Sequence, residues 1–504
     1  MLKKNLEEKT PCRKAEVLKY ASLVVFGFCW ITGCTVGPNF KPPNPSLPAA
    51  WKGATAADSA RISTTVPEPV TLVEWWKSFN DSTLSSLMER AMRSNLDVRQ
   101  ASARIRQARA SRGVGAAALW PTLDASALYR RSGSGDSSSG GNTTDTSSLI
   151  RGGGDQNLFS AGLDAAWELD FFGGTRRNIE ALDADLQATV EDRRDVLVTL
   201  LAEVGVNYID LRGLQGQKAI AEENLRAQQK TADITRRRFE AGFVTGLDVA
   251  NAAAQTATTA SRIPVLEASI QSTIYNLSVL LGEPPTALAQ ELQEKAPIPV
   301  TPPQIPIGLP SDLIRRRPDI RRVEAQIHAA TARIGVATAD LYPKFSLTGN
   351  LQFSADDFAS VANWNNRSWS VGPNVLWPIF DAGRIRWNIE VQKAVEEQTL
   401  LAYEQTVLSA LKDVETSLVA YAREQENLKL LGEAVMNNRK AVDLSMELYT
   451  SGQTDFLNVI TAQQSLFVSE EAQILSRRNL AIDGVSLYKA LGGGWEKGEE
   501  GMVR

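Results

Sequence analysis

The chain has 504 residues, of which 22% are charged and 43% hydrophobic, and its formal net charge is −4. This balance, without a basic patch interleaved with aromatic residues, gives no reason to expect nucleic acid as a partner. The only histidine, His328, rules out a multi-histidine metal site, and no cysteine–histidine cluster has zinc-ligand spacing. Phosphate-binding loop, HExxH and nucleophile-elbow motifs are also absent from the sequence. We therefore expect no catalytic residue, no metal and no cofactor, and an enzyme is only a remote alternative.

Residues 1–33 have the organisation of a secretory signal. A basic leader precedes a short apolar run, Ala21 to Ile31, which is shorter than the roughly 20 residues that a membrane-spanning helix needs. The run ends in Ile31-Thr32-Gly33-Cys34, which resembles a bacterial lipobox. We expect cleavage before Cys34, a lipid on that cysteine, and an extended tether over 34–72. An ordinary signal peptide with a chance cysteine is the alternative.

The other cysteines agree with this processing. Cleavage before Cys34 would remove Cys12 and Cys29, so the mature chain would have no free thiol. Such a chain suits an oxidising periplasm. Residue 35 is Thr and not the Asp that retains lipoproteins in the inner membrane, so the resemblance implies delivery to the outer membrane.

The second half of the sequence repeats the first. The segment around Asp97 matches that around Asp319 at an offset of 319 − 97 = 222, and the segment around Trp167 matches that around Trp377 at 377 − 167 = 210. The 12-residue difference belongs to a stretch rich in Gly, Ser and Thr, Ser132 to Gly154, which is typical of a long mobile loop. An internal repeat of this length indicates two copies of one structural unit.

We expect each repeat to contain a helix, a β-hairpin, a long helix and a further helix. Repeat 1 covers 73–296, a proline-rich strap covers 297–310, repeat 2 covers 311–492, and a C-terminal tail covers 493–504. Few helix breakers occur over 176–238 and 384–448, and helices of that length approach about 100 Å. Such helices need lateral packing along their whole length.

Four runs alternate apolar and polar residues, which is the pattern of strands with one apolar face. They begin after Pro121, at Phe159, after Pro343 and at Trp369. Each has about the 9–11 residues of a tilted membrane-spanning strand. A soluble sandwich with one wet face is the alternative for any single strand. Because a lipid-facing sheet allows no open edge and single-chain barrels begin at about eight strands, four strands predict a barrel shared between chains.

Several motifs in this order resemble the TolC-like outer-membrane efflux factors, most closely the lipid-anchored subgroup labelled NodT. The motifs are the lipobox with Gly37-Pro38 and Lys41-Pro42, Leu313 to Ile320, Leu341-Tyr342-Pro343, Trp377 to Gly383, and Tyr488 to Trp495. The resemblance covers nearly the whole mature chain.

The resemblance implies an α+β membrane protein in which each internally duplicated subunit gives four strands to a trimeric, 12-stranded transmembrane β-barrel. Its long helices would build a periplasmic α-helical barrel. The expected function is the passive exit duct of a tripartite pump for drugs or other small molecules. The implied partners are two further copies of the chain, a periplasmic adaptor (membrane fusion) protein, an inner-membrane transporter of the resistance-nodulation-division type, and outer-membrane lipid. No nucleic acid is expected.

In that family the channel closes at the periplasmic tip, near the two segments that contain Gly242 and Gly452. We expect these glycines to shape the surface that meets the adaptor. The gate candidates are Asp248, Asn251, Asp455, Asn458 and Tyr449. A ring of acidic residues at such a constriction favours cations, although ordinary helix capping is an equal alternative for each residue. The family often has aspartate where this chain has Asn458, so the ring is weaker here or is carried by Asp455.

Two other functions use the same features. A type I protein-secretion duct has the same scaffold, and the lipid anchor argues against it. A non-conducting structural lipoprotein made of periplasmic coiled coils is the other alternative, and the four amphipathic strands argue against that. The cargo, the cognate adaptor and transporter, and the gating trigger do not follow from the sequence.

Overall fold

The computed structural model describes residues 35–52, 72–133, 156–302, 305 and 307–499. The expected signal peptide, Cys34 and most of the predicted glycine- and serine-rich loop therefore lie outside the described residues. The chain divides into two compact units. The first contains the residues up to Lys41 together with Ala108–Asp185 and Ile327–Thr399, and the second contains Pro42–Gln107, Leu186–Gln326 and Leu400–Arg504.

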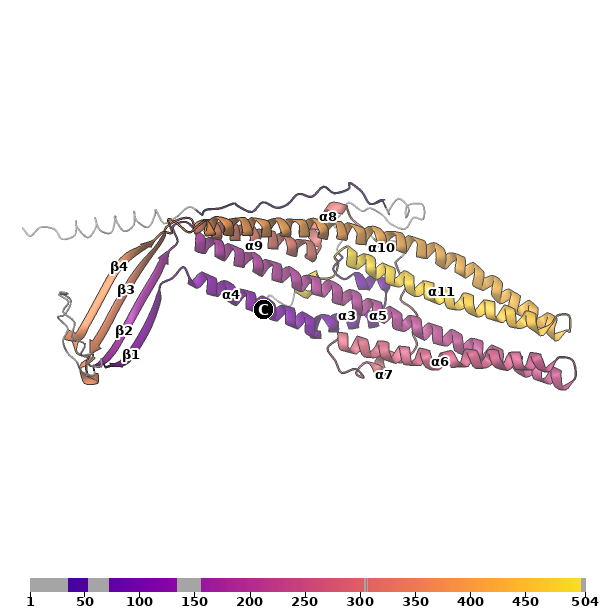
Figure 1. The fold of residues 1–504 in the computed structure, drawn as a ribbon. Helices are drawn as coiled ribbons and strands as arrows, with labels where there is room; N and C mark the ends of the chain where they lie inside the picture. Colours follow the sequence, from indigo (N-terminus) through magenta and orange to yellow (C-terminus); the bar gives the residue numbers. More distant parts are fainter. Residues whose placement is uncertain (1–34, 53–71, 134–155, 303–304, 306, 500–504) are drawn as a thin grey trace, which may run out of the picture. The chain divides into compact units, whose positions relative to one another are not determined.

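Each of the three longer helices of repeat 1 has a counterpart of equal length in repeat 2, as the internal duplication predicts (Figure 1). The pairs contain 22, 67 and 35 residues, respectively: α4 Leu96–Ala117 with α9 Pro318–Ala339, α5 Gly174–Glu240 with α10 Arg384–Thr450, and α6 Gly246–Leu280 with α11 Phe456–Ala490. A rise of about 1.5 Å per residue makes α5 and α10 each about 100 Å long.

The remaining helices are short. They are η1 Trp75–Phe79, α3 Ser82–Ser94, α7 Ala289–Leu292, α8 Pro310–Arg316, η2 Phe358–Ser360, η3 Trp364–Asn366 and η4 Glu496–Glu499. α3 begins at a side-chain cap, because the carboxylate of Asp81 accepts a hydrogen bond of 2.9 Å from the backbone nitrogen of Leu84.

Both long helices end in the same turn and the chain then reverses direction, so that α6 returns along α5 and α11 returns along α10 (Figure 1). At the end of α5, Phe243 N donates to Arg238 O and Gly242 N donates to Phe239 O. The matching bonds at the end of α10 are made by Gln453 and Gly452. This is a Schellman motif, in which the residue after the helix needs a positive φ. Gly242 and Gly452 supply φ values of 80° and 78°.

The sheet in the first unit has four antiparallel strands in the order β1-β2-β3-β4. They are β1 Thr122–Ser132, β2 Gln156–Leu169, β3 Lys344–Ala355 and β4 Arg367–Leu376. The register places apolar residues in one row across all four strands: Ala125, Leu163, Leu351 and Trp369. The neighbouring row is polar: Asp124, Asp164, Asn350 and Ser370. One face of the sheet is therefore apolar and the other polar.

Neither face of this sheet is covered within the described chain. All eleven residues of β1 are exposed, and large apolar side chains on the other strands are exposed as well, including Trp369 at 71% and Val371 at 72%. Among the described residues, β1 and β4 each pair on one side only. An open-edged sheet with a bare apolar face is incomplete in a single copy.

The second unit has a dense aromatic core. Trp76 and Phe79 of η1 are almost fully buried, and Trp75 stacks on Tyr488 of α11 with ring centroids 5.2 Å apart. The hydroxyl of Tyr208 on α5 donates to Asp81 at 2.8 Å, which fixes the cap of α3 to the long helix. This core joins the beginning of repeat 1 to the end of repeat 2.

In the first unit, the segment after Cys34 is held by α5 and α9. The guanidinium of Arg177, on a side chain that is 4% exposed, donates to Val36 O at 3.1 Å and to Asn39 Oδ1 at 2.6 Å. The ring of His328 stacks on Phe40 with centroids 4.5 Å apart, and its Nε2 lies 3.1 Å from Glu180 Oε1.

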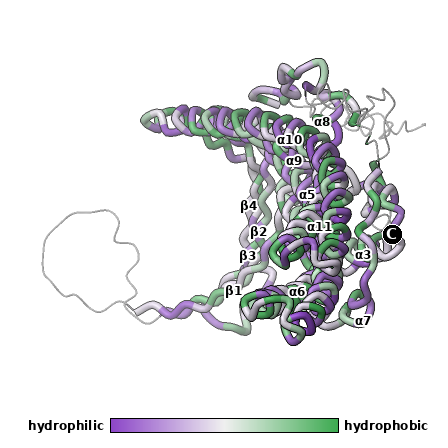
Figure 2. The backbone as a smooth tube through the Cα atoms, turned by 90° about the vertical axis from the view of Figure 1, so that its right-hand side faces the viewer, coloured by the Kyte–Doolittle hydropathy of each residue, from purple (hydrophilic) through white to green (hydrophobic). Residues whose placement is uncertain are grey.

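Hydrophilic and hydrophobic residues are interspersed along the long helices (Figure 2). Within the described ranges, no helix combines the length and the apolar character that crossing a membrane as a helix requires.

Candidate functional site

The turn between α5 and α6 uses an acidic residue to begin a helix. Thr245 is the N-cap of α6, and its hydroxyl accepts a hydrogen bond from Asp248 N at 3.4 Å. The carboxylate of Asp248 accepts in return from Thr245 N at 2.9 Å and from the Thr245 hydroxyl at 2.8 Å. This reciprocal capping box engages one of the two acidic gate candidates.

The matching turn between α10 and α11 places its acid differently. Asp455 is the N-cap of α11, at the position of Thr245, but its side chain accepts no cap hydrogen bond and is exposed. Asn458 stands where repeat 1 has Asp248, and its amide donates to Thr454 Oγ1 at 2.7 Å. The carboxylate of Asp455 is thus the less constrained of the two. Asn251, on the first turns of α6, is exposed.

Tyr449, the aromatic gate candidate, is buried within the chain and is only 1% exposed. It packs in a cluster with Ala252, Phe456 and Val459. Its ring centroid is 5.8 Å from that of Phe456, and its hydroxyl donates to Thr235 Oγ1 at 3.3 Å. Tyr449 therefore joins α10 to α5 and α11, and its ring is not on the surface of the single copy.

Arg238, which the sequence patterns did not single out, contacts the end of α10. Its guanidinium lies 4.7 Å from the centre of the Tyr449 ring. The same group donates to the carbonyl oxygens of Tyr449 at 2.8 Å and Thr450 at 3.2 Å. A cation at the C-terminus of α10 complements the helix dipole and satisfies two terminal carbonyls. Repeat 2 has Leu448 at the matching position, so this latch between the repeats occurs once per chain.

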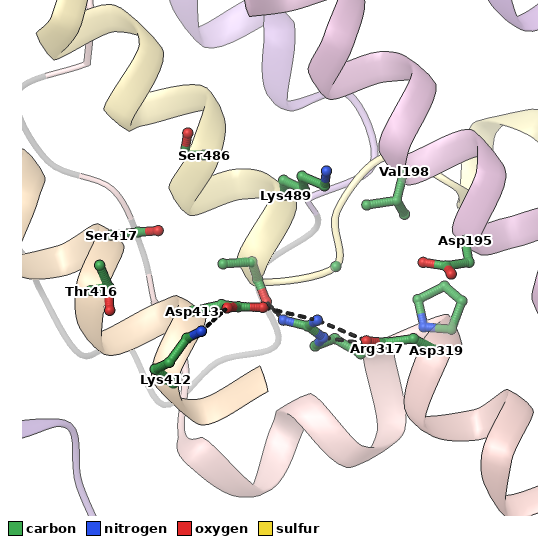
Figure 3. Close-up of a pocket in the computed structure, with 13 residues that line it drawn as sticks. Asp195, Val198, Arg317, Asp319, Lys412, Asp413, Thr416, Ser417, Ser486 and Lys489 are labelled. Atoms are coloured by element: carbon green, nitrogen blue, oxygen red, sulfur yellow. Dashed lines mark hydrogen bonds and ion pairs between the residues drawn. The ribbon is translucent and has the colours of Figure 1, made fainter. Parts of the chain in front are cut away.

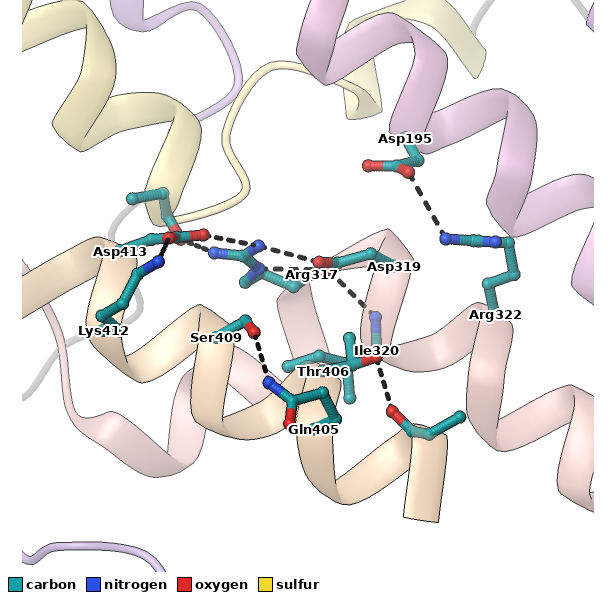
Figure 4. Close-up of polar contacts among 12 residues, drawn as sticks. Asp195, Arg317, Asp319, Ile320, Arg322, Gln405, Thr406, Ser409, Lys412 and Asp413 are labelled. Carbon is teal, nitrogen blue, oxygen red and sulfur yellow. Dashed lines mark hydrogen bonds and ion pairs between the residues drawn. The ribbon is translucent and has the colours of Figure 1, made fainter. Parts of the chain in front are cut away.

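A second constellation lies where α8 meets α9, at the segment Arg317-Pro318-Asp319 that carried part of the family resemblance (Figure 3). Arg317 holds Asp319 through two hydrogen bonds, of 2.7 and 3.0 Å, and reaches Asp413 of α10 at 3.4 Å (Figure 4). A fourth hydrogen bond, of 3.0 Å, is donated by Arg317 Nη1 to the carbonyl oxygen of Ala490 at the end of α11. One partly buried guanidinium thus contacts three helices, α9, α10 and α11.

Repeat 1 makes the same contact with a neutral side chain. The amide of Asn95 donates to Leu280 O at 2.8 Å, and Leu280 holds in α6 the position that Ala490 holds in α11. The following glycines, Gly282 and Gly492, have φ values of 71° and 73°. Both repeats therefore dock the end of their last helix against the start of their 22-residue helix.

Beside Arg317 is a hollow of about 440 Å³, lined by polar residues that include Asp195, Lys412 and Lys489. Burial raises the pKa of the Asp195 carboxyl, and the nearby Asp319 raises it further, while Arg322 opposes the shift. The hollow has donors and acceptors of both charges, which does not select one ligand class.

The chain matches the family model described as outer membrane efflux protein over residues 87–283 and 309–493. It is 34% identical over 437 residues to the pyoverdine export outer membrane protein OpmQ of Pseudomonas aeruginosa, which covers 86% of this chain and 89% of that protein. It is 31% identical over 465 residues to nodulation protein T of Rhizobium leguminosarum bv. trifolii, with coverages of 92% and 95%.

Solved structures agree with the sequence relatives. The outer-membrane channel OprN superimposes with a TM-score of 0.81 at 35% identity over 92% of this chain and 100% of that chain. CusC, whose structures concern transmembrane channel formation, gives a TM-score of 0.76 at 25% identity, again over 92% of this chain. These likenesses confirm the predicted fold class, an internally duplicated α+β subunit of an outer-membrane channel. The chain belongs to the outer membrane efflux protein family.

Proposed function

We propose that this protein is the exit duct of a tripartite efflux pump, a passive homotrimeric channel that conducts small molecules across the outer membrane. An inner-membrane transporter of the resistance-nodulation-division type would supply the energy, and a periplasmic adaptor would connect the two. The channel itself would carry out no catalysis and use no cofactor. Family membership supports this role, since the relatives are outer membrane efflux proteins.

The observation that carries the proposal is the incomplete sheet. Its four strands have one apolar and one polar face, and both edges are open in the described chain. In a membrane, an open edge leaves backbone groups without hydrogen-bond partners, and each costs several kcal/mol. Three copies joined edge to edge give a closed barrel of twelve strands, with apolar side chains toward lipid and polar side chains toward the channel.

We further propose that Cys34 carries the lipid anchor after removal of residues 1–33, and that 34–72 is the tether. The contacts of Arg177 and His328 with residues 36–40 support a fixed path for the first part of that tether. We also propose that the two repeats cover 73–296 and 311–492. A proline-rich strap at 297–310 would join them, and a C-terminal tail would cover 493–504.

For the gate, we propose that Asp455 carries most of the charge at the constriction. Its carboxylate accepts no cap bond, whereas that of Asp248 accepts two. Asn251 and Asn458 would contribute polar groups, and Tyr449 would act indirectly, by holding the turn in place.

The adaptor would meet the two turns shaped by Gly242 and Gly452. The repeat 1 turn presents Phe243 and Leu247, which are 74% and 68% exposed. An exposed apolar group at the end of a helical hairpin favours contact with another protein.

The decisive experiment combines assembly with conduction. The full-length protein, isolated from outer-membrane fractions, should run as a heat-modifiable trimer and form ohmic channels in planar bilayers. A monomer without conductance would overturn the proposed function and favour a structural lipoprotein.

The gate assignment is tested by neutral substitutions in the same bilayers. Asp455→Asn should raise single-channel conductance and reduce cation preference, because cations are no longer held at the constriction. Asp248→Asn should have a smaller effect, and Asp443→Asn, on α10 before the turn, serves as the matched control. Conductance and reversal potential that stay unchanged in both the Asp455 and Asp248 variants would contradict the assignment.

A further inference from the structure

The apolar face of the sheet contains arginine among its hydrophobic residues. Arg131 of β1 lies opposite Asn157 of β2, and Arg367 of β4 lies opposite Phe353 of β3. Side chains alternate between the two faces of a strand, so this register places both arginines on the same face as Trp369. The other strand positions on that face are all uncharged. The carboxylates of the strands lie on the polar face: Asp124, Asp164 and Glu168.

Both arginines lie at the same end of the sheet, the loop end, where β1 leads toward β2 and β3 leads into β4. Arg131 is the last but one residue of β1, and Arg367 is the first residue of β4. The opposite ends of the same strands are joined to α4 and α10. In the proposed channel the helices are periplasmic, so the loop end faces the exterior and the outer leaflet of the membrane.

Aromatic rings surround the arginines at the loop end. The rings of Tyr129 and Phe159 have centroids 4.6 Å apart, and Phe358 of η2 lies 5.9 Å from Phe159. Trp364 of η3 lies 6.0 Å from Phe353. Phe358 and Trp364 are 78% and 64% exposed. Because a girdle of aromatic residues marks the boundary between bilayer and water on membrane β-barrels, the loop end of the apolar face has the composition of a surface at headgroup depth.

The guanidinium of Arg367 is held in one orientation by its own loop. Its Cζ atom lies 4.7 Å from the centre of the Trp364 ring, and its Nη1 donates to the carbonyl oxygen of Trp364 at 2.8 Å. Within the part of the chain that the structure describes, no carboxylate pairs with Arg367, and its Nε and Nη2 donate no hydrogen bond. These two nitrogens form a fork that matches two oxygens of a phosphate group.

The opposite end of the apolar face, where the strands join the helices, has aromatic rings but no charged residue on the strands. Phe345 of β3 packs edge-on against Phe171, with ring centroids 5.1 Å apart. The strand cation at that end, Lys344, belongs to the polar face and pairs with Asp340 at 3.0 Å. Both ends therefore fit a membrane boundary, and only the loop end adds positive charge to it.

We propose that Arg367 and Arg131 bind an outer-leaflet lipid whose headgroup carries phosphate monoesters. Such a phosphate has up to two negative charges and accepts paired N–H bonds from a guanidinium. The exposed rings of Phe358 and Trp364 then lie beside the headgroup. In the proposed trimer, β4 of one copy adjoins β1 of the next, so each junction presents one arginine from each copy to the same leaflet. The inference rests on the proposed channel and names the lipid that its outer end selects.

The surroundings of the two arginines favour a lipid over a soluble anion. Trp369 follows Arg367 by two residues on the same face and is exposed, and Tyr129 precedes Arg131 by two residues and is also exposed. In the proposed barrel these rings contact acyl chains, so an anion beside them is best supplied by a molecule with an apolar tail. A zwitterionic headgroup fits less well, because its ammonium group is repelled by the guanidinium groups.

Binding is tested on full-length trimers in detergent, with bound lipid counted by native mass spectrometry. The probe is lipid A, which carries two phosphate monoesters. Dephosphorylated lipid A is the matched comparator with the same acyl chains, and phosphatidylglycerol is an anionic comparator without a monoester. Lipid A should bind with an affinity about tenfold higher than either comparator. Equal affinity for lipid A and its dephosphorylated form, or for lipid A and phosphatidylglycerol, would overturn the proposal.

Substitutions test the two arginines in the same measurement. Arg131→Gln combined with Arg367→Gln should lower the affinity for lipid A about tenfold, to that of the dephosphorylated lipid. Arg130→Gln is the matched control, since Arg130 is adjacent to Arg131 on β1 but lies on the polar face, and its affinity should equal that of the parent. Arg367→Lys keeps the charge and loses the paired N–H geometry, so its affinity should fall between the two. An equal loss in Arg130→Gln and in the double variant would contradict the assignment.

The outcomes separate lipid binding from the proposed function. The double variant should still form heat-modifiable trimers and conduct ions in planar bilayers, because both arginines lie on the face away from the proposed channel. Conducting parent trimers that do not distinguish the three lipids would overturn the lipid site and leave the channel proposal intact. A parent protein that is monomeric and without conductance would overturn both.

Discussion

The two repeats of this chain build helices of equal length but end them with different chemistry. At the start of the 22-residue helix, repeat 1 uses the amide of Asn95 and repeat 2 uses the guanidinium of Arg317, each bound to the same carbonyl of its last helix. At the turn, repeat 1 has a closed capping box and repeat 2 has an exposed aspartate. The duplicated backbone therefore keeps its geometry while its polar contacts diverge, because several side chains satisfy the same backbone group.

The largest difference between the repeats is expected in the stability that is lost when Arg317 or Asn95 is replaced by alanine. Arg317→Ala leaves Asp319 without its cation, removes one of the two cations beside Asp413 and leaves the Ala490 carbonyl without its donor. It should therefore cost about 3 kcal/mol of stability. Asn95→Ala removes only neutral bonds and should cost about 1–2 kcal/mol. Thermal unfolding of the detergent-solubilised protein, followed by near-ultraviolet circular dichroism, measures both, and equal losses would contradict the distinction.

The next largest effect is expected for the contact of Arg238 with the end of α10, which has no counterpart at Leu448 in repeat 2. Arg238→Leu gives repeat 1 the residue that repeat 2 carries at Leu448, and removes two charged hydrogen bonds and a cation–π contact. The last turn of α10 should then exchange its amide hydrogens about 30-fold faster, which corresponds to about 2 kcal/mol of local stability. Arg236→Leu, at an exposed neighbouring position, is the control. Equal amide exchange in the two variants would show that Arg238 does not stabilise the last turn of α10.

A pH-dependent difference is expected at Asp483 of α11, where repeat 1 has Thr273. Burial and the nearby Glu424 raise the pKa of Asp483 to about 6. Because this value exceeds that of the unfolded chain, the folded protein binds the proton more tightly, and stability falls as pH rises from about 4 to about 6. Asp483→Asn should therefore stabilise the protein by about 1–2 kcal/mol at pH 8. Melting temperatures at pH 8 and pH 4 test this, since the gain should disappear at pH 4.

The smallest effect should come from the two caps. Thr245→Ala breaks the capping box of α6 and should cost about 1 kcal/mol. Asp455→Ala, at the matching position, removes a side chain that accepts no cap bond and should cost less than about 0.5 kcal/mol. Amide exchange over the first turn of each helix gives the comparison, and a larger loss at Asp455 would show that its carboxylate caps α11 in solution.

The sequence by itself determined the fold class and the family. The signals that carried these predictions are local or periodic: alternation along the strands, long stretches without helix breakers, and the repeat offsets. They can be recognised without knowledge of tertiary contacts. The reversal at Gly242 and Gly452 was also open to prediction, because a positive φ after a helix selects glycine. The pattern Thr245-x-x-Asp248 even contained the signal for a capping box, which would have separated Asp248 from Asp455.

Only the tertiary structure decided which residues far apart in the sequence meet. Arg238 and Tyr449 are 211 residues apart, and Arg317 and Ala490 are 173 apart. No periodicity links such positions, since their contact depends on how two helices are rotated and staggered against each other. The burial of Tyr449 and the exposure of Trp387 follow from that packing. Sequence identified the parts of the channel subunit, and packing decided which of its faces are closed within one chain and which are left for the next.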